Sequence, residues 1–289
     1  MVKYYALAVT TKYWKPGQDY LKEITNSIAR RVENGDFVVV SEKAVSTALG
    51  NIVDESLIRP SLNAKLIAKP WMRFMWGYVL GALCHFGQRL LQRLRAYPIA
   101  AGSRHKQIAL QQAGLLQALM FGSEGGIDGS NLPYSYVSLP LKNAYALAEK
   151  IQQQIWLTLQ KKVTVIIVDT DKTYSFRNFH FTPRPNPMKG IHSHWGIGAY
   201  VAGRFFKLKR RSTPLGVAGG SLQAEEALKI AHIADRARGP GAGATVWDMA
   251  ARFKVAVTGV SWDMLARVTH KPIVIVRRAA GKRWSQAEF

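Results

Sequence analysis

The chain has 289 residues, with 40 Lys and Arg against 18 Asp and Glu, and a formal net charge of +22. Apolar residues make up 48% of it and charged residues 20%, which excludes a disordered chain and indicates a folded one. A pI of about 10.2 predicts a surface that attracts polyanions, whether RNA, an anionic membrane or phosphate-bearing ligands. The single cysteine, Cys84, excludes a disulfide within the chain and fits a reducing compartment, so we expect a cytoplasmic protein.

The apolar pattern predicts both helices and strands. Helices are expected within 17–33, 105–121, 141–160 and 221–238, and buried strands within 36–43, 163–168 and 271–278. This alternation predicts a mixed α+β (α/β) fold with mixed β-sheets and flanking helices. We expect a single folded region over 1–289, with the last residues, 279–289, frayed.

The longest apolar run, 74–87, is followed by the basic segment 88–95, QRLLQRLR. It is too short to span a bilayer, which needs about 20 residues, and the first residues of the chain lack a signal-peptide pattern. We favour a buried helix that continues into a solvated basic helix, and an interfacial helix on an anionic membrane stays open. The basic segments 88–95 and 207–212 are typical of solvated faces, with RNA binding as the alternative.

An acidic, glycine-rich loop follows at 122–135, GSEGGIDGSNLPYS. Glu124 and Asp128 are unusual there because the chain is so poor in acids. They either pair with cations of the protein or hold a cation from outside. The glycines allow a close backbone approach or positive φ, although Asp-Gly and Ser-Asn also occur in ordinary turns.

Two further aspartates, Asp169 and Asp171, follow the β-branched run VTVIIV. Open α/β sheets bind ligands at the carboxyl ends of their strands. A buried carboxylate there needs a partner, because an unpaired buried ion is costly. The partner is either an Arg or Lys of the protein, or a divalent ion such as Mg or Mn.

Two other patterns are less specific. His180, His192 and His194 are a rival metal site, with ordinary hydrogen-bonded or exposed histidines as the competing interpretation. Thr245 and Asp248 predict a capped helix start behind the glycine-rich segment 238–244. That start is either a structural turn or an anion-binding helix terminus.

Three segments, in this order, resemble the coenzyme F420 gamma-glutamyl ligase family, which adds glutamate to a deazaflavin coenzyme. DFVVVSEKAVSTALG (36–50) is similar to the family's DVLVVTQKIVSKAEG, and SEGGIDGSNLP (123–133) to NAGVDASNVP. VTVIIVDTDKTYSFRN (163–178) is similar to VAVIISDTFGRPWRNG, and KPGQDYLKEI near the amino terminus also matches. Together these segments cover about half of the chain.

The resemblance implies a GTP-dependent enzyme that uses Mg or Mn, has a mixed α+β fold and forms a dimer. It implies metal ligands at Asp128, Asp169 and Thr170. It implies nucleotide contacts at Asn131, Glu42, Lys43, Thr11 and Lys12. It also offers an answer for the acidic loop, which would hold the metal that neutralises the triphosphate.

The implied reaction joins glutamate to the carboxylate of a small anionic acceptor, coenzyme F420-0 or a related compound, through an acyl phosphate. A carboxylate is inert toward an amine until one of its oxygens becomes a leaving group, and GTP would supply that group. The alternative function is a non-catalytic protein that keeps the fold and binds RNA or another polyanion through its basic surface.

The chain departs from the family pattern in several places. Thr47 stands where the family has a second lysine, Glu124 where it has Asn, and Asp171 is an additional acid. Residues 56–104 are expected to be an insertion, and the family's long acidic loop near the carboxyl end is reduced to 267–272. These departures predict a divergent member whose acceptor and nucleotide can differ from those of the family.

Overall fold

A computed structural model describes residues 3–122 and 124–279. Its main sheet is mixed, because β2 and β5 pair in parallel and the other neighbours pair antiparallel. In spatial order its strands are β1 (Tyr4–Thr11), β8 (His270–Arg278), β2 (Phe37–Ser41), β5 (Thr164–Phe176) and β6 (Phe179–Phe181), with β7 (Lys209–Ala218) also paired to β5. The mixed α+β prediction is confirmed.

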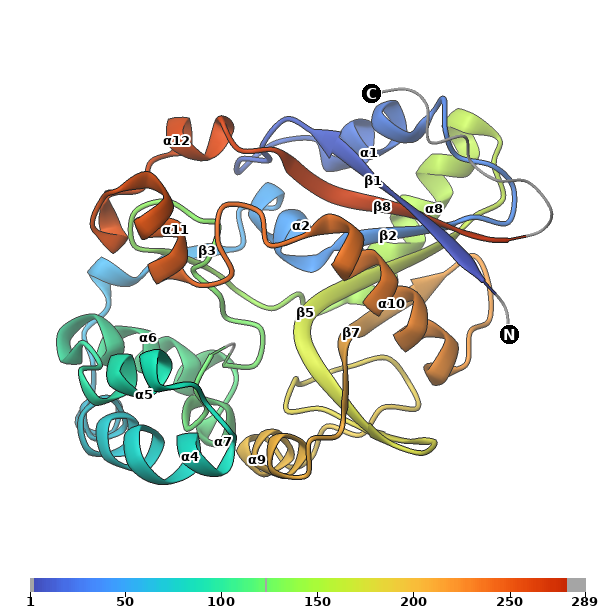
Figure 1. Ribbon diagram of the computed structural model, residues 1–289. Coiled ribbons are helices and arrows are strands. Elements are labelled where there is room, and N and C mark those ends of the chain that lie inside the picture. Colours follow the sequence, from blue (N-terminus) through green and yellow to red (C-terminus); the bar gives the residue numbers. More distant parts are fainter. Residues whose placement is uncertain (1–2, 123, 280–289) are drawn as a thin grey trace.

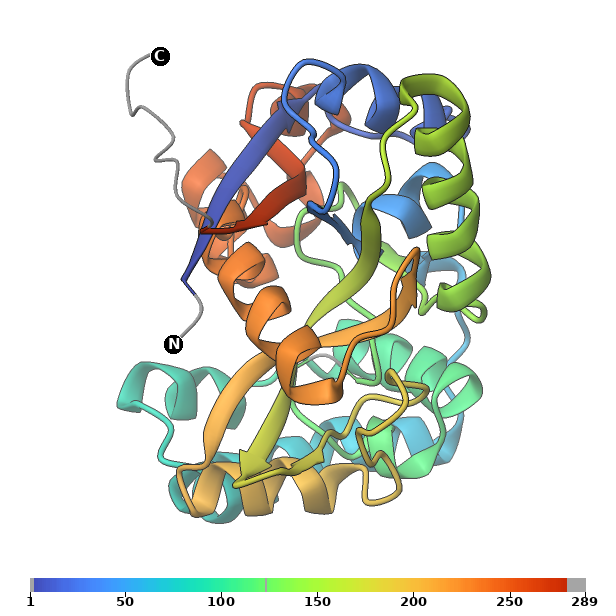
Figure 2. The same ribbon diagram turned by 90° about the vertical axis from the view of Figure 1, so that its right-hand side faces the viewer.

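Helices cover both faces of this sheet (Figures 1 and 2). They are α1 (Tyr20–Ile28) and α8 (Ala144–Leu159) on one face and α10 (Ala224–Arg238) on the other. Alternate residues of β2 therefore enter different cores: Val38 and Val40 pack with α1 and α8, while Phe37 and Val39 pack with α10. Because both faces are covered, the strand is a continuous apolar run rather than an alternating one.

A second layer consists of helices from the middle of the chain, at the lower left of Figure 1. They are η1 (Glu55–Leu57), α3 (Leu62–Leu66), η2 (Ile67–Leu80), α4 (Gly81–Leu83), α5 (Gln88–Arg95), α6 (Ile99–Gln112) and α7 (Leu115–Ala118). Their core contains Met72, Trp76, Cys84 and Leu94, and α9 (Ile197–Phe205) packs against it. The strands β5 and β7 extend from the sheet toward this layer (Figures 1 and 2).

Shorter elements complete the fold. They are α2 (Glu42–Ala48), the paired strands β3 (Ile52–Asp54) and β4 (Tyr136–Ser138), α11 (Val246–Phe253), η3 (Val257–Gly259) and α12 (Trp262–Ala266). No helix among the described residues is long and apolar enough to cross a membrane. Residues 56–104, the expected insertion, fold as helices that pack on one another; whether they are an insertion stays a prediction.

Several predicted bounds were wrong. The predicted helix 105–121 is two helices, because Gly114 has a φ of 94° and ends α6. The strand predicted at 163–168 continues to Phe176. Its pairing with β7 shifts in register at Ile167/Val168 and between Asp169 and Lys172, and these shifts let the polar residues stay paired with β7. Strands β1, β6 and β7 and helix α9 were not predicted. Apart from Ala279, the predicted frayed tail lies outside the described residues.

Candidate active site

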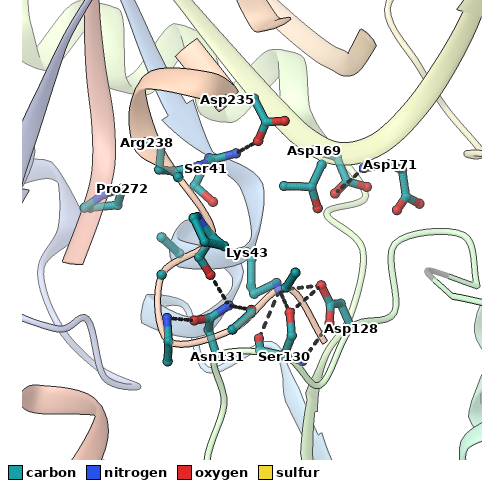
Figure 3. A pocket seen from close by; sticks show the side chains of 18 of the residues that line it. Ser41, Lys43, Asp128, Ser130, Asn131, Asp169, Asp171, Asp235, Arg238 and Pro272 are labelled. Carbon is teal, nitrogen blue, oxygen red and sulfur yellow. Dashed lines mark hydrogen bonds and ion pairs between the residues drawn. The ribbon is translucent and has the colours of Figure 1, made fainter. Parts of the chain in front are cut away.

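A cavity of about 600 Å³ lies where the parallel pairing of β2 and β5 ends, at Ser41 and Val168. Five separate segments supply most of its polar lining (Figure 3). They are the start of α2, the acidic loop, the middle of β5, the segment from the end of α10 to α11, and residues 269–271. Of the residues predicted for the site, Lys43, Asp128, Asn131, Asp169 and Thr170 line this cavity.

Lys43 and Asp128 form an ion pair at the floor of the cavity. Lys43 Nζ also donates to the carbonyl of Ser130 at 3.0 Å and to its hydroxyl at 2.8 Å, as the dashed lines of Figure 3 show. The backbone N–H of Ser130 donates to Asp128 Oδ1 at 2.6 Å, which is the Asx turn that the sequence left open. Asp128 is therefore paired with a cation of the protein.

Arg184 makes the corresponding contact to the second acidic segment. Its Nε donates to Asp169 Oδ2 at 2.7 Å and its Nη2 to Glu42 Oε1 at 2.6 Å, and Nη1 donates to the carbonyl of Gly125. The Arg184 side chain is 2% exposed, so this is a buried junction between β5, α2 and the acidic loop. Gly126 makes it possible, because a Cβ there would lie 2.4 Å from Arg184 Cζ.

The junction shifts the pKa values of its members. Burial raises the pKa of Glu42 to about 7, since Arg184 lowers it by less than burial and Asp169 raise it. Burial lowers the pKa of Arg184, but Glu42 and Asp169 raise it by more, so it lies above its ordinary value. Glu42 also accepts a hydrogen bond from the N–H of Leu141 at 2.7 Å. Glu42 does not line the cavity and holds Arg184 from behind it.

Glu124, the other acid of the loop, lies elsewhere. It is 3% exposed and accepts hydrogen bonds from Lys106 Nζ at 2.5 Å and His105 Nε2 at 2.9 Å. His105 Nδ1 in turn contacts Glu55 at 2.5 Å. Burial lowers the pKa of His105, but Glu124 and Glu55 raise it by more, to about 10. Burial raises the pKa of Glu124, but Lys106 and His105 lower it by more, to about 2. Glu124 therefore stabilises the helical layer and is not among the residues that line the cavity.

Asn131 holds the glycine-rich segment before α11. Its Nδ2 donates to the carbonyl of Gly243 at 3.0 Å, and its Oδ1 accepts from the N–H of Ala242 at 2.6 Å. The predicted capped start is confirmed: Thr245 accepts from the N–H of Asp248 at 3.2 Å, and α11 begins at Val246. Asn131 therefore shapes the wall of the cavity through this loop.

Thr11, Lys12 and the three histidines of the rival metal site, His180, His192 and His194, lie outside the cavity lining. The hydroxyl of Thr11 contacts His270 Nδ1 at 3.2 Å, and Lys12 is exposed. His180 contacts Ser175 at 3.0 Å and His192 stacks on Phe179, so these histidines do not meet the aspartates. Among residues 3–122 and 124–279, no group of three or more His, Cys, Asp or Glu side chains is placed to hold a metal ion.

Three positions that depart from the family pattern are placed by the structure. Thr47 is buried, lines the cavity and donates to the carbonyl of Lys43 at 2.8 Å. The reduced segment 267–272 contributes most of its residues to the cavity wall. Asp171 is also part of the lining and donates its N–H to Asp169 Oδ1 at 3.3 Å.

Arg184 and a second charged group, centred on Asp235, were not predicted from the sequence. Asp235 accepts from Lys172 Nζ at 3.0 Å, Ser212 Oγ at 2.6 Å and Arg238 Nη2 at 2.8 Å. Burial raises the pKa of Asp235, but these donors lower it by more, to about 2. Asp235 and Arg238 lie at the end of a predicted helix, directly before a glycine-rich loop, and this position could have marked them as candidate site residues. Arg184 lies in a proline-rich stretch with no such signal.

Comparisons with known proteins show to which family the chain belongs. The family model described as F420-0:Gamma-glutamyl ligase matches residues 8–213. The uncharacterized protein MJ1361 of Methanocaldococcus jannaschii is 33% identical over 284 residues, which cover 94% of this chain and 96% of that protein. The coenzyme F420:L-glutamate ligase of Archaeoglobus fulgidus is 29% identical over 160 residues, which cover 54% of this chain and 55% of that enzyme. The resemblance seen in the sequence is confirmed, and the chain belongs to the F420-0:gamma-glutamyl ligase family.

Proposed function

We propose that the protein is a ligase that joins glutamate to the carboxylate of a small anionic acceptor, coenzyme F420-0 or a related compound, at the expense of GTP and with Mg or Mn. The observation that carries this proposal is that Lys43, Asp128, Asp169 and Thr170, which come from three separate segments, line one cavity in a member of this family. Membership of the family is the ground for proposing amide-bond formation with glutamate. The polar lining of the cavity is the ground for proposing that a nucleotide and a metal ion bind there.

The donor set fits a divalent ion that arrives with phosphates. Asp128, Asp169 and Thr170 offer hard oxygen ligands to one space, which suits Mg or Mn. Mg is usually bound through one or two carboxylates together with substrate phosphates and water, so a closed protein cage is not needed. When bound, the ion neutralises the triphosphate and polarises the phosphoryl group that is transferred.

The cations of the site divide into fixed and movable ones. Arg184 is buried and holds both Asp169 and Glu42, so it fixes Asp169 in place. Lys43 has a side chain that is 21% exposed to the cavity, on a flexible stem. A cation held by Asp128 would take the place of Lys43 as the partner of this carboxylate, and the ammonium group of Lys43 would then be available to a phosphate of the nucleotide.

The chemistry then needs two displacements. A carboxylate oxygen of the acceptor attacks the γ-phosphorus of GTP, the bond to the bridging oxygen breaks, and GDP leaves. The amine nitrogen of glutamate next attacks the acyl carbon of the acyl phosphate, phosphate leaves, and the nitrogen loses a proton. Lys43 stabilises the charge on the phosphoryl group, and the cavity holds the reacting groups together, which supplies much of the rate.

Calorimetry with GTP and Mn tests the proposal at the binding step. We expect heat of binding for the wild-type protein and at least about a hundredfold weaker binding for Asp128→Asn and Asp169→Asn, since even outer-shell changes at metal sites cost 10- to 100-fold. Asp263→Asn is the matched control, because Asp263 is exposed and lies outside the cavity lining. No heat with any nucleoside triphosphate would contradict the proposal.

A second measurement tests the reaction. Mass spectrometry should show the acceptor gaining the mass of a glutamyl residue, with GDP and phosphate formed in equal amounts. RNA binding that weakens steeply with salt and ignores Asp128→Asn and Asp169→Asn, in a protein without ligase activity, would support the polyanion-binding alternative instead.

A further inference from the structure

Helices α3, η2 and α4 follow one another without a break and form a single helical rod from Leu62 to Leu83. One side of this rod is buried in the helical layer through Ala68, Met72 and Trp76. The other side carries large apolar residues that face solvent. They are Leu62 (71% exposed), Leu66 (51%), Phe74 (61%), Tyr78 (55%) and Leu83 (42%).

The spacing of these residues makes them one face. Intervals of four and five residues correspond to about one turn of a wide helix, and the eight residues from Leu66 to Phe74 to about two turns. The rings of Phe74 and Tyr78 lie 5.8 Å apart. We call this surface the rod face and define it by the five residues above. These five side chains are 42–71% exposed, so no residue among 3–122 and 124–279 covers the rod face, and an exposed apolar patch of this kind marks an interaction site.

The residues around the rod face are basic. Between Glu55 and Glu124 the sequence contains no Asp or Glu. Lys65 and Lys69 are exposed on the rod itself, and the guanidinium of Arg95, from α5, lies 4.2 Å from the ring centroid of Tyr78. Any partner of this face must therefore be apolar at its centre and anionic around it.

The end of α9 extends the apolar surface beyond Leu83. Phe205 (46% exposed) and Phe206 (67%) lie there, and their rings contact each other edge to face. Arg204 Nε donates to the carbonyl of Cys84 at 3.3 Å, which ties the two segments together. Lys207, next in the chain, is exposed and adds another positive charge.

We propose that the rod face rests on an anionic lipid surface, with its apolar side chains in the headgroup region and its basic residues on lipid phosphates. A basic helix with exposed Leu and aromatic side chains, which does not combine the length and apolarity of a membrane span, is typical of interfacial binding. A second copy of the chain is disfavoured as the cover, because a symmetric interface would set the same lysines and arginines against each other. RNA is disfavoured because three of the five rod-face residues, Leu62, Leu66 and Leu83, are aliphatic and offer no ring for a base to stack on.

This proposal is independent of the ligase proposal, because no residue of the rod lines the cavity. Flotation with phosphatidylcholine vesicles, with and without phosphatidylglycerol, tests it directly. We expect the protein to bind only the vesicles that contain phosphatidylglycerol, and less tightly as salt is raised. Failure to bind these vesicles at low salt would overturn the proposal.

Paired variants separate apolar from electrostatic binding. Phe74→Ser with Tyr78→Ser should weaken vesicle binding at least about tenfold, because two exposed rings lose their burial in the headgroup region. Lys65→Gln with Lys69→Gln should weaken it by about the same factor. Leu157→Ser is the matched control: Leu157 is 71% exposed on α8, away from the rod, and the variant should bind like wild type.

Two outcomes would overturn the proposal even if the protein binds anionic vesicles. Unchanged binding by the Phe74→Ser, Tyr78→Ser variant would mean that charge alone attracts the protein. A wild-type dimer that this variant converts to a monomer, seen by light scattering, would show that the rod face is a subunit interface. Because the changed residues are exposed, far-ultraviolet circular dichroism should show both variants folded.

Discussion

Lys43 and Asp128, which are 85 residues apart in the chain, form an ion pair inside the cavity. The pair joins the first turn of α2 to the acidic loop. It also gives one carboxylate two competing partners, the lysine that it contacts and the divalent ion that we propose. Changes to Lys43 should therefore affect metal and nucleotide in opposite directions.

Lys43→Gln should strengthen the binding of Mn alone by about tenfold, because Asp128 loses a charged hydrogen-bond donor. The same change should weaken GTP binding by about tenfold, because a phosphate loses its cation. Titrations of Mn with and without GTP, followed by electron paramagnetic resonance, measure both effects. Lys150→Gln, an exposed change on α8, should alter neither affinity, and a loss of both affinities in Lys43→Gln would contradict this view of the pair.

Arg184→Met should lower the free energy of unfolding by about 3–5 kcal/mol, because it leaves Glu42 and Asp169 without their shared buried cation. Denaturant unfolding measures the loss. The same change made together with Glu42→Gln should cost less, since one uncompensated charge has been removed. Arg59→Met, at an exposed arginine, should be nearly neutral, and an equally small effect at Arg184 would mean that the junction does not stabilise the fold.

Gly126→Ala should be destabilising by about 3 kcal/mol or more. The new Cβ would lie 2.4 Å from Arg184 Cζ, and the residue has a φ of 96°, which alanine rarely adopts. Gly87→Ala is the matched control, because nothing lies within 4 Å of a Cβ there. Thermal unfolding of the two variants should differ clearly; equal melting temperatures would show that Arg184 moves aside without cost.

His105→Gln should change how stability depends on pH. The pKa of His105 is about 10 in the folded protein against an ordinary 6.5, so its stabilising contribution is complete below pH 6.5 and is lost as the pH rises through 10. The difference in unfolding free energy between wild type and His105→Gln should therefore be largest at about pH 6 and shrink toward pH 10. Urea unfolding across this range measures it.

His194→Gln serves as the control for that series, because His194 is exposed. Its difference from wild type should stay small and constant with pH. A difference for His105→Gln that also stays constant would mean that Glu124 and Glu55 do not hold a proton on the imidazole.

Local sequence was sufficient for the elements with strong apolar patterns. The runs in β2, β5 and β8 and the helices α8 and α10 lie close to their predicted positions. It was insufficient for β7, whose first residues are Lys209, Arg210 and Arg211. Three consecutive basic residues are typical of a solvated face. Only the pairing with β5 makes this segment a strand, and Arg211 is buried there in contact with Glu225.

The same division holds for the cavity. The resemblance to the family implied one site, and five of its residues share one space: Lys43, Asp128, Asn131, Asp169 and Thr170. Thr11, Lys12 and Glu42, which it also implied, do not line the cavity. The sequence did not predict the support behind the five lining residues, because Arg184 and Asp235 have no local pattern that marks them.

The sequence by itself determined the family, the mixed fold and the two acidic segments that face one cavity, because apolar runs and short motifs depend on residue type and order. Only the tertiary structure decided which cation each acid contacts: Lys43 for Asp128, Arg184 for Asp169, and Lys106 with His105 for Glu124. The physical reason is that an ion pair depends on distance in space, and in a chain with 40 Lys and Arg nearly every acid has many candidate partners along the sequence.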